Sequence, residues 1–249
     1  MSDRQGVSFS QMMADSEKAD VIFVAETHDD KKHHEVQFDV VRSLWSKKIP
    51  LAIGLEMFQM DNQNFLDDWV EGRISEQDFK TIFARNWSYD WSLYRNIFIF
   101  ARDNRVPMIA LNIPKDIILK VVRQGFASLS PEELKYLPSG INNKLNKPQI
   151  DFLTKTFQAV FKREANGKVF ANFSEAQAVR DSCMALIIAS ELKKHPGRKI
   201  VTLAGTWHSV KHGIPERLSN IKSEVIVLEI PELGVKNSSS ELADYLIEK

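Results

Sequence analysis

The sequence predicts an α/β fold: an open, doubly wound, mostly parallel sheet with a helical insertion before the last strands. Several runs of residues are continuously apolar, as in strands that are buried on both faces. Stretches of helical length separate these runs. Five strands are too few for an eight-stranded barrel, which favours the open sheet. The apolar runs are residues 21–25, 51–55, 107–111, 200–204 and 225–230.

The length of 249 residues fits a single domain over 1–249. Lys and Arg number 33 and Asp and Glu also number 33. This balance excludes a globally basic nucleic-acid binder, and we expect no nucleic-acid partner. The single cysteine, Cys183, excludes a disulfide framework and a Cys-rich metal site, and its apolar surroundings predict a buried thiol. No apolar run of the sequence is long enough to predict a membrane span or a signal peptide.

Helices are predicted where apolar residues recur at helical spacing, over 32–47 and 92–104. Between the third and fourth apolar runs, residues from about 120 to 173 contain no strand pattern, and we interpret them as a helical insertion that caps the sheet. Capping boxes predict three further helix starts. These boxes begin at Ser130, at Ser174 and at Ser238 with Glu241.

Polar residues follow four of the predicted strands at the point where each strand ends. Ligands of open α/β sheets bind beyond the carboxyl ends of the strands, so we expect these side chains to converge in one site. Each has a structural alternative: Glu56 could pair with a Lys or Arg, Asn112 could cap the next helix, and His208 could be a hydrogen-bonded histidine at a helix entrance. The residues are Glu26 and His28, then Glu56, Asn112 and His208.

Two chemistries fit this combination of carboxylates and imidazoles. Glu26, His28, Glu56 and His208 could bind a divalent metal such as zinc, iron or manganese. Without a metal, one carboxylate could act as a general base and a histidine as a general acid. The sequence contains neither a Walker A motif nor a GxGxxG motif, which argues against a nucleotide site.

A second polar set shares one helical face within residues 174–184: Gln177, Arg180 and Asp181. We interpret it as the polar first turn of a helix that points at the strand ends, with Arg180 available to bind a carboxylate or phosphate. Arg180 and Asp181 are therefore candidate catalytic residues. The alternative for this pair is a surface ion pair.

Three other features are weaker indications of function. His33 and His34 lie in the first predicted helix, where we expect them to be solvated. Residues 212–215 resemble a helix entrance, whose free backbone N–H groups could receive an anion. Aromatic residues cluster at 87–94; such clusters usually pack in a core or lid, but they also suit a flat apolar cofactor, and a tyrosinate can bind haem iron. The cluster consists of Trp87, Tyr89, Trp91 and Tyr94.

Segments that run nearly from end to end resemble, in combination, the ChaN-like haem-binding uptake proteins. They are AETHDDKKHHEVQ at 25–37, LAIGLEMF at 51–58, WVEGRISEQDF at 69–79, NWSYDWSLYRNIFIFAR at 86–102, IALNIP at 109–114, GFASLSPEELKYLP at 125–138, FSEAQAVRDSCMA at 173–185 and LAGTWHSVKHGIPERL at 203–218.

The resemblance implies an α/β domain with a helical part, haem bound through tyrosine, homodimers that enclose haem, and a role in iron uptake. Trp87, Tyr94 and Tyr136 are the residues expected to bind haem.

The chain departs from the family pattern at two places. Ala25 precedes Glu26 where the family usually has glycine, and the family tyrosine near position 150 is missing from a segment that reads Gln149, Ile150 and Phe152.

The family is usually exported and often lipid-anchored, so we expect a periplasmic or outer-membrane-anchored lipoprotein, with a cytoplasmic protein as the alternative. Residues 6–24 already match the start of the family domain. We therefore expect any export signal upstream of them, and membrane contact only through an anchor absent from this chain.

More distantly, the fold resembles the erythromycin esterase and TIKI protease group, whose hydrolytic residues correspond to Glu26, His28, Glu56 and His208. We therefore expect haem binding, with an esterase- or amidase-type hydrolase, with or without a metal, as the alternative. A third interpretation is a binding module that keeps this site as a scaffold. Haem is too large and apolar to replace water among these charged groups, so we expect it elsewhere, against the helical insertion or at a dimer interface.

Overall fold

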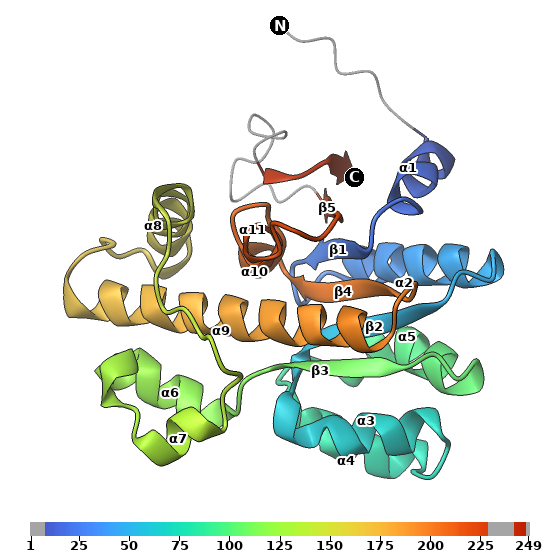
Figure 1. The fold of residues 1–249 in the computed structure, drawn as a ribbon, viewed down its shortest axis with the longest axis horizontal. Helices are drawn as coiled ribbons and strands as arrows, with labels where there is room; N and C mark the ends of the chain where they lie inside the picture. The colour runs from blue at the N-terminus through green and yellow to red at the C-terminus, as the bar shows by residue number, and fades with distance from the viewer. Residues whose placement is uncertain (1–7, 229–241, 248–249) are drawn as a thin grey trace, which may run out of the picture.

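A computed structural model describes residues 8–228 and 242–247 of the chain. A six-stranded sheet with the order β3-β2-β4-β1-β5-β6 forms its centre (Figure 1). All neighbouring strands are parallel. The predicted open α/β sheet is confirmed. The strands are β1 (Val21–Glu26), β2 (Leu51–Gln59), β3 (Met108–Asn112), β4 (Lys199–Gly205), β5 (Ser223–Leu228) and β6 (Tyr245–Ile247).

The described helices occur between the strands and before the first one. They are α1 (Phe9–Ser16), α2 (Lys31–Ser46), α3 (Gln63–Val70), α4 (Glu76–Asn86), α5 (Trp91–Asp103), α6 (Lys115–Gln124), α7 (Pro131–Lys135), α8 (Lys147–Phe161), α9 (Gly167–Lys194), α10 (Thr206–Ser209) and α11 (Ile214–Arg217). Two short 3-10 turns, Met60–Asn62 and Phe126–Ser128, lie beside α3 and α6.

The strands are continuously apolar because both faces of the sheet are covered. Along β1, Ile22 and Val24 face a core formed with α1 to α5. The alternate residues Val21 and Phe23 face a second core, to which Met184 of α9 belongs. The five apolar runs therefore became β1 to β5, whereas β6 was not predicted because its three half-buried residues form no such run.

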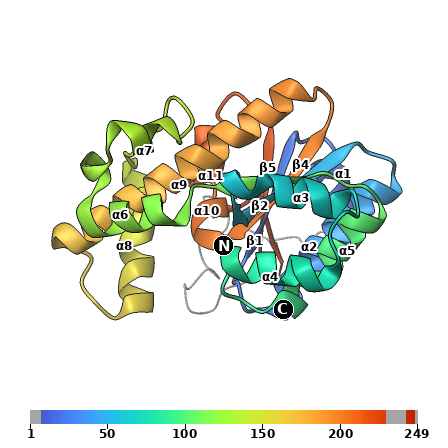
Figure 2. The same ribbon diagram turned by 90° about the horizontal axis from the view of Figure 1, so that it is seen from below.

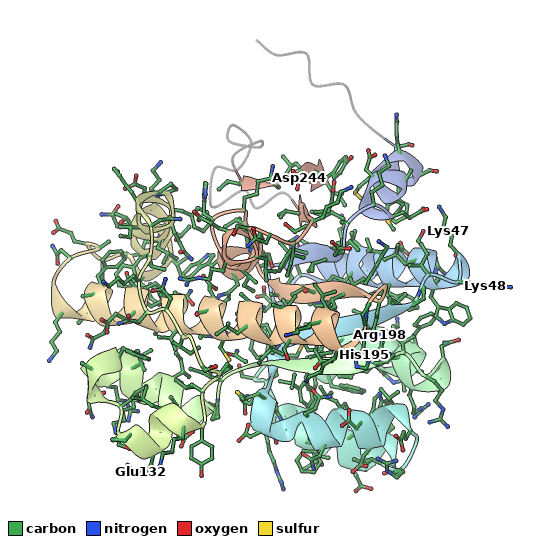
Figure 3. The ribbon with its side chains drawn as sticks, viewed as in Figure 1. Lys47, Lys48, Glu132, His195, Arg198 and Asp244 are labelled. Atoms are coloured by element: carbon green, nitrogen blue, oxygen red, sulfur yellow. The ribbon has the colours of Figure 1, made fainter. Side chains whose placement is uncertain are left out.

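The segment between β3 and β4 is helical and contains α6 to α9. Figure 2 shows α6, α7, α8 and the start of α9 beside the sheet, while the rest of α9 runs back across it. A third apolar core joins Ile117 and Val121 of α6 to Val179 and Cys183 of α9. Figure 3 labels Glu132 on α7 in this helical segment, and His195 at the other end of α9.

The predicted helix starts had different outcomes. Ser130 forms a complete capping box with Glu133 at the start of α7, as predicted. The prediction at Ser174 is wrong, because α9 begins at Gly167 and Ser174 lies inside it. The box at Ser238 lies outside the described residues. In the part of the chain that the structure describes, no helix has the length and apolar character needed to cross a membrane.

Candidate functional site

The polar residues expected at the strand ends lie at one edge of the sheet. Glu26 ends β1 and is in register with Gly205, which ends β4. Asn112 ends β3. Glu56 lies between Leu55 and Gln59 of β2, where the register with β3 shifts, and irregularities of this kind re-aim side chains. His28 lies in the loop after β1, two positions beyond Glu26, and His208 lies in α10 directly after β4.

Glu26 is buried and accepts hydrogen bonds on both carboxylate oxygens. Its Oε1 accepts from His28 Nδ1 at 2.7 Å and from the Tyr94 hydroxyl at 2.6 Å. Its Oε2 accepts from Gln37 Nε2 at 2.6 Å. Burial raises the pKa of Glu26, but the hydrogen bond and charge of His28, together with His34 and Tyr94, outweigh burial and lower the pKa overall.

His28 is the member of this group that reaches the surface, with 25% of its side chain exposed. Its ring lies 4.9 Å from Trp87 and 5.0 Å from Tyr89, centroid to centroid. Burial lowers the pKa of His28, but the hydrogen bond to Glu26 and the charges of Glu56 and Glu26 raise it overall. A Cβ atom at Gly205 would lie 2.7 Å from His28 Cε1, so the imidazole packs in space that only glycine leaves open.

Glu56 forms a second buried group with residues from α9 and β4. Its Oε1 accepts from Arg180 Nη2 at 2.5 Å, and its Oε2 accepts from the backbone N–H of Gly205 at 2.6 Å. His208 Nε2 lies 3.5 Å from Oε1. Burial raises the pKa of Glu56, but the nearby charges of His208, Arg180 and His28 and the Gly205 hydrogen bond lower it to about 2.

Arg180 reaches the strand ends from the interior of α9, not from a first turn as predicted. Its Nε donates to Asn112 Oδ1 at 3.2 Å, and Gln177 Oε1 lies 3.5 Å from its Nη1. Asn112 also donates to the Glu56 backbone carbonyl at 2.9 Å. The suggested helix cap at Asn112 is wrong, because α6 has Pro114 at its N-cap position and no side-chain cap. The surface ion pair is also wrong: Arg180 is paired with buried Glu56.

Asp181 and His208 form a third buried pair. His208 Nδ1 lies 2.5 Å from Asp181 Oδ1, and Asp181 Oδ2 accepts from Gln149 Nε2 at 2.5 Å. Gln149 comes from α8, so this chain of hydrogen bonds links the helical segment to the edge of the sheet. The six residues predicted as catalytic therefore form two bonded groups at this edge, Glu26 with His28 and Glu56 with Arg180, His208 and Asp181.

The divalent-metal site expected at Glu26, His28, Glu56 and His208 is not found. Within residues 8–228 and 242–247, no group of three or more His, Cys, Asp or Glu side chains is arranged to hold a metal ion. Both oxygens of Glu26 and of Glu56 already accept hydrogen bonds from protein groups. A metal bound there would have to displace Arg180 from Glu56 or Gln37 from Glu26. The sequence could not reveal that these hydrogen bonds occupy the carboxylates.

A cleft of about 450 Å³ opens above this polar floor. Glu26, His28, Glu56, Arg180 and His208 line the floor. The wall is apolar and comes from the helical segment and α10. Its residues are Ile118, Val122, Val160, Phe173 and Trp207.

The residues expected to bind haem lie at different depths. Tyr94 is fully buried, donates its hydroxyl to Glu26 and receives a hydrogen bond from Trp87 Nε1 at 3.1 Å. Burial and the charge of Glu26 raise the pKa of the Tyr94 hydroxyl. Tyr136 is 68% exposed at the end of α7 and is not among the residues that line the cleft. The tyrosine that does line the cleft is Tyr89, for which the aromatic cluster was the only signal.

The prediction that His33 and His34 are solvated is wrong, since they are only 1% and 2% exposed. His33 Nδ1 accepts from the Thr27 backbone N–H at 2.7 Å. His34 and Gln37 lie one turn apart on the face of α2 behind Glu26. Sequence reasoning missed both; their spacing of three residues, on the helix that follows Glu26, was the available signal.

Two smaller predictions concern residues away from the floor. Cys183 is buried as predicted, and burial raises the pKa of its thiol to about 12. The helix entrance predicted at 212–215 is the start of α11, which is a single turn.

Comparison with known proteins shows the family to which the chain belongs. A sequence profile described as haem-binding uptake, Tiki superfamily, ChaN matches residues 12–218. The chain belongs to the ChaN family. Among solved structures, this ChaN-family chain is similar to ChaN of Campylobacter jejuni, whose structure is described as showing cofacial haem binding. The TM-score is 0.75 at 21% identity, over 98% of this chain and 92% of that one.

Two further proteins are similar to this ChaN-family chain. A mutant of erythromycin esterase EreC in its open conformation has a TM-score of 0.55 at 14% identity, over 97% of this chain and 79% of that one. At these identities the likeness to both solved structures shows the fold alone. The protein RETICULATA-RELATED 5, chloroplastic, of Arabidopsis thaliana is 27% identical over 243 residues; the match covers 88% of this chain but only 32% of that protein.

Proposed function

We propose that this ChaN-family chain binds haem in the cleft between the sheet edge and the helical segment. The apolar wall of the cleft carries the proposal. Val122 and Val160 line it and are nonetheless exposed, Val160 by 53%. Phe173 and Trp207 add aromatic surface, with their ring centroids 5.8 Å apart. Covering this wall with a porphyrin removes apolar area from water, which favours binding by roughly 25 cal/mol per Å².

Haem fits the wall better than the floor. The volume of about 450 Å³ lies within the range of about 300–1,000 Å³ that is usual for cofactor and ligand sites. The carboxylates of the floor are already hydrogen-bonded to Arg180, Gln37 and His28. A porphyrin pressed among them would take water from charged groups without replacing its hydrogen bonds. We therefore assign the wall to haem.

Three tyrosines are candidate iron ligands. Tyr89 lines the cleft, which favours it for haem bound to the same chain. Tyr94 would first have to release its hydrogen bond to Glu26. Tyr136 is exposed on the helical segment and would reach haem only across an interface between two copies.

Titration with haemin tests the proposal directly. A tyrosinate-bound ferric haem has a characteristic Soret band and charge-transfer bands. We expect saturable spectral change for the parent protein and loss of the charge-transfer bands in one of Tyr89→Phe, Tyr94→Phe and Tyr136→Phe. Absence of a saturable change in the parent protein would refute haem binding. Unchanged spectra in all three variants would exclude these three tyrosines as iron ligands.

We also propose that haem binding is coupled to dimerisation and serves haem or iron uptake. The support is the family, together with the exposed apolar residues beside the wall, such as Phe161 at 47%. Sedimentation velocity with and without haemin tests the coupling. A haem-dependent shift from one copy to two is expected, and a haem-loaded protein that sediments as a single copy would contradict it.

A second candidate function is acid–base hydrolysis at the floor, without a metal. His28 is the observation that favours it, because its Nδ1 is bonded to buried Glu26 while the ring lines the cleft. A carboxylate that orients a histidine in this way is typical of general-base catalysis.

An ester and amide screen tests this second function. We expect Glu26→Gln to lose any hydrolysis that the parent protein shows, and Glu35→Gln, an exposed carboxylate of α2 paired with Lys31, to keep it. Equal rates in the parent and in Glu26→Gln would exclude the floor as a hydrolytic site. In that case the floor is a scaffold, and its variants alter stability alone.

A further inference from the structure

His34 lies behind the floor of the cleft and is buried. Its Nε2 is 3.1 Å from the backbone carbonyl of His28, and its Nδ1 is 3.0 Å from Gln37 Oε1. Its ring lies 4.1 Å from that of Tyr94, centroid to centroid. Both ring nitrogens therefore face oxygen atoms.

The orientation of the Gln37 amide decides what His34 must donate. Gln37 Nε2 is 3.1 Å from the backbone carbonyl of Val24 and 2.6 Å from Glu26 Oε2. A backbone carbonyl only accepts hydrogen bonds, so the atom facing it has to be the amide nitrogen. Gln37 Oε1 is therefore the atom that faces His34, and it too only accepts.

A neutral imidazole has a single N–H and cannot donate to two acceptors at once. We infer that His34 carries a proton on both ring nitrogens and is the fixed positive charge behind Glu26. Glu26 Oε2 lies 3.6 Å from His34 Nδ1, close enough to serve as its counter-charge. In the described part of the chain, the titratable residues that contact His34 are Glu26 from β1, Tyr94 from α5 and His28 from the loop after β1.

This charge gives His34 a role as a positioning residue. A cation behind Glu26 keeps its carboxylate ionised, so Glu26 acts as an acceptor for His28 Nδ1 and not as a proton donor. The other nitrogen, His28 Nε2, is then the atom of the pair left for a ligand in the cleft. This role rests on the second candidate function, whereas the protonation of His34 does not.

Nitrogen-15 NMR of the haem-free protein at neutral pH tests the inference, because protonated and unprotonated ring nitrogens resonate far apart. The signals that disappear in His34→Gln belong to His34. If that variant does not fold, single variants of the other five of the six histidines assign the His34 signals by elimination. We expect both His34 nitrogens at the protonated position. One unprotonated His34 nitrogen would overturn the inference whether or not the protein binds haem or hydrolyses esters.

Removal of the counter-charge gives a second, independent readout. In Glu26→Gln we expect the His34 signals to change to those of a singly protonated ring, because no buried anion remains beside it. Glu35→Gln removes an exposed carboxylate from the same helix and should leave the His34 signals unchanged. Identical His34 signals in the parent protein and Glu26→Gln would show that Glu26 is not the counter-charge.

Discussion

At the scale of single residues, the site consists of buried carboxylates that are each held by several hydrogen-bonding or charged partners. Glu56 is held by Arg180 and Gly205, Glu26 by His28, Tyr94 and Gln37, and Asp181 by His208 and Gln149. Taking a charge out of water is costly, and an ion pair offsets that cost only while both partners are present. The removal of one partner should therefore destabilise this protein far more than the loss of an exposed pair.

Arg180→Ala tests that expectation against a matched pair on the surface. It leaves the Glu56 carboxylate buried without its cation, so we expect a loss of about 3–5 kcal/mol of unfolding free energy. Arg95→Ala breaks an exposed Arg–Glu pair, with Glu76, and should cost much less. Urea unfolding measures both, and equal losses would mean that the Arg180–Glu56 pair contributes no more than a surface pair.

The same carboxylate predicts how stability depends on pH. The pKa of Glu56 is lowered from 4.5 to about 2 in the folded protein. A lowered pKa means that the unfolded chain binds the proton first, so the stabilisation is present above about pH 4.5 and is lost as the pH falls towards about 2. At about 1.4 kcal/mol per pKa unit, Glu56 accounts for roughly 3 kcal/mol of that loss.

Unfolding measured across this pH range, in the parent protein and in Glu56→Gln, isolates the contribution. The variant is less stable at neutral pH because Arg180 loses its partner, but it should lose less further stability on acidification. An equally steep acid loss in both proteins would assign the effect to other carboxylates.

At the scale of secondary structure, the sequence predicted what depends on local pattern and burial. The apolar runs predicted β1 to β5 because a strand covered on both faces needs apolar residues throughout. The same reasoning failed within α9, where the residues from Ser174 match a capping box although the helix begins at Gly167. A capping box is a four-residue signal, and it cannot show whether a preceding turn is already helical.

The site itself was predictable only in part, since its residues follow the strands but their partners come from distant segments. The ends of the apolar runs 21–25, 51–55 and 200–204 predicted Glu26, Glu56 and His208. The bond from Arg180 to Glu56 spans 124 positions of sequence, and that from Tyr94 to Glu26 spans 68. Hydrogen bonds at such separations depend on the packing of whole helices, which no local pattern specifies.

Two serines distinguish a true helix start from a false one. Ser130→Ala removes the Oγ that accepts from the Glu133 backbone N–H, which is the side-chain half of the capping box of α7, and should cost about 1 kcal/mol. Ser174→Ala should change stability by less than about 0.5 kcal/mol, because no cap is lost. The Ser174 hydroxyl also has no hydrogen-bond partner within the described part of the chain. Chemical denaturation of the two variants side by side makes the comparison; a larger loss in Ser174→Ala would contradict it.

At the scale of the whole molecule, the cleft lies where two parts of the fold meet. The floor carboxylates Glu26 and Glu56 belong to β1 and β2 of the sheet, and the wall belongs to α6, α8, α9 and α10. Arg180 of α9 and His208 of α10 also reach the floor. The contacts of Arg180 with Glu56 and of Asp181 with His208 connect the two parts. A ligand held by the wall alone would therefore stabilise the folded protein without altering the chemistry of the floor.

This separation predicts different effects for wall and floor variants. Haem that binds only the folded state should stabilise it by about 2.7 kcal/mol at a free concentration a hundred times Kd, measured as a rise in Tm. Val160→Asp introduces a charge into the wall and should abolish the rise. Leu134→Asp, an exposed apolar residue of α7 away from the cleft, should keep it, and so should His208→Asn at the floor. If His208→Asn loses the haem-dependent rise while its haem-free Tm stays close to that of the parent, haem contacts the floor, and the wall and floor form one site.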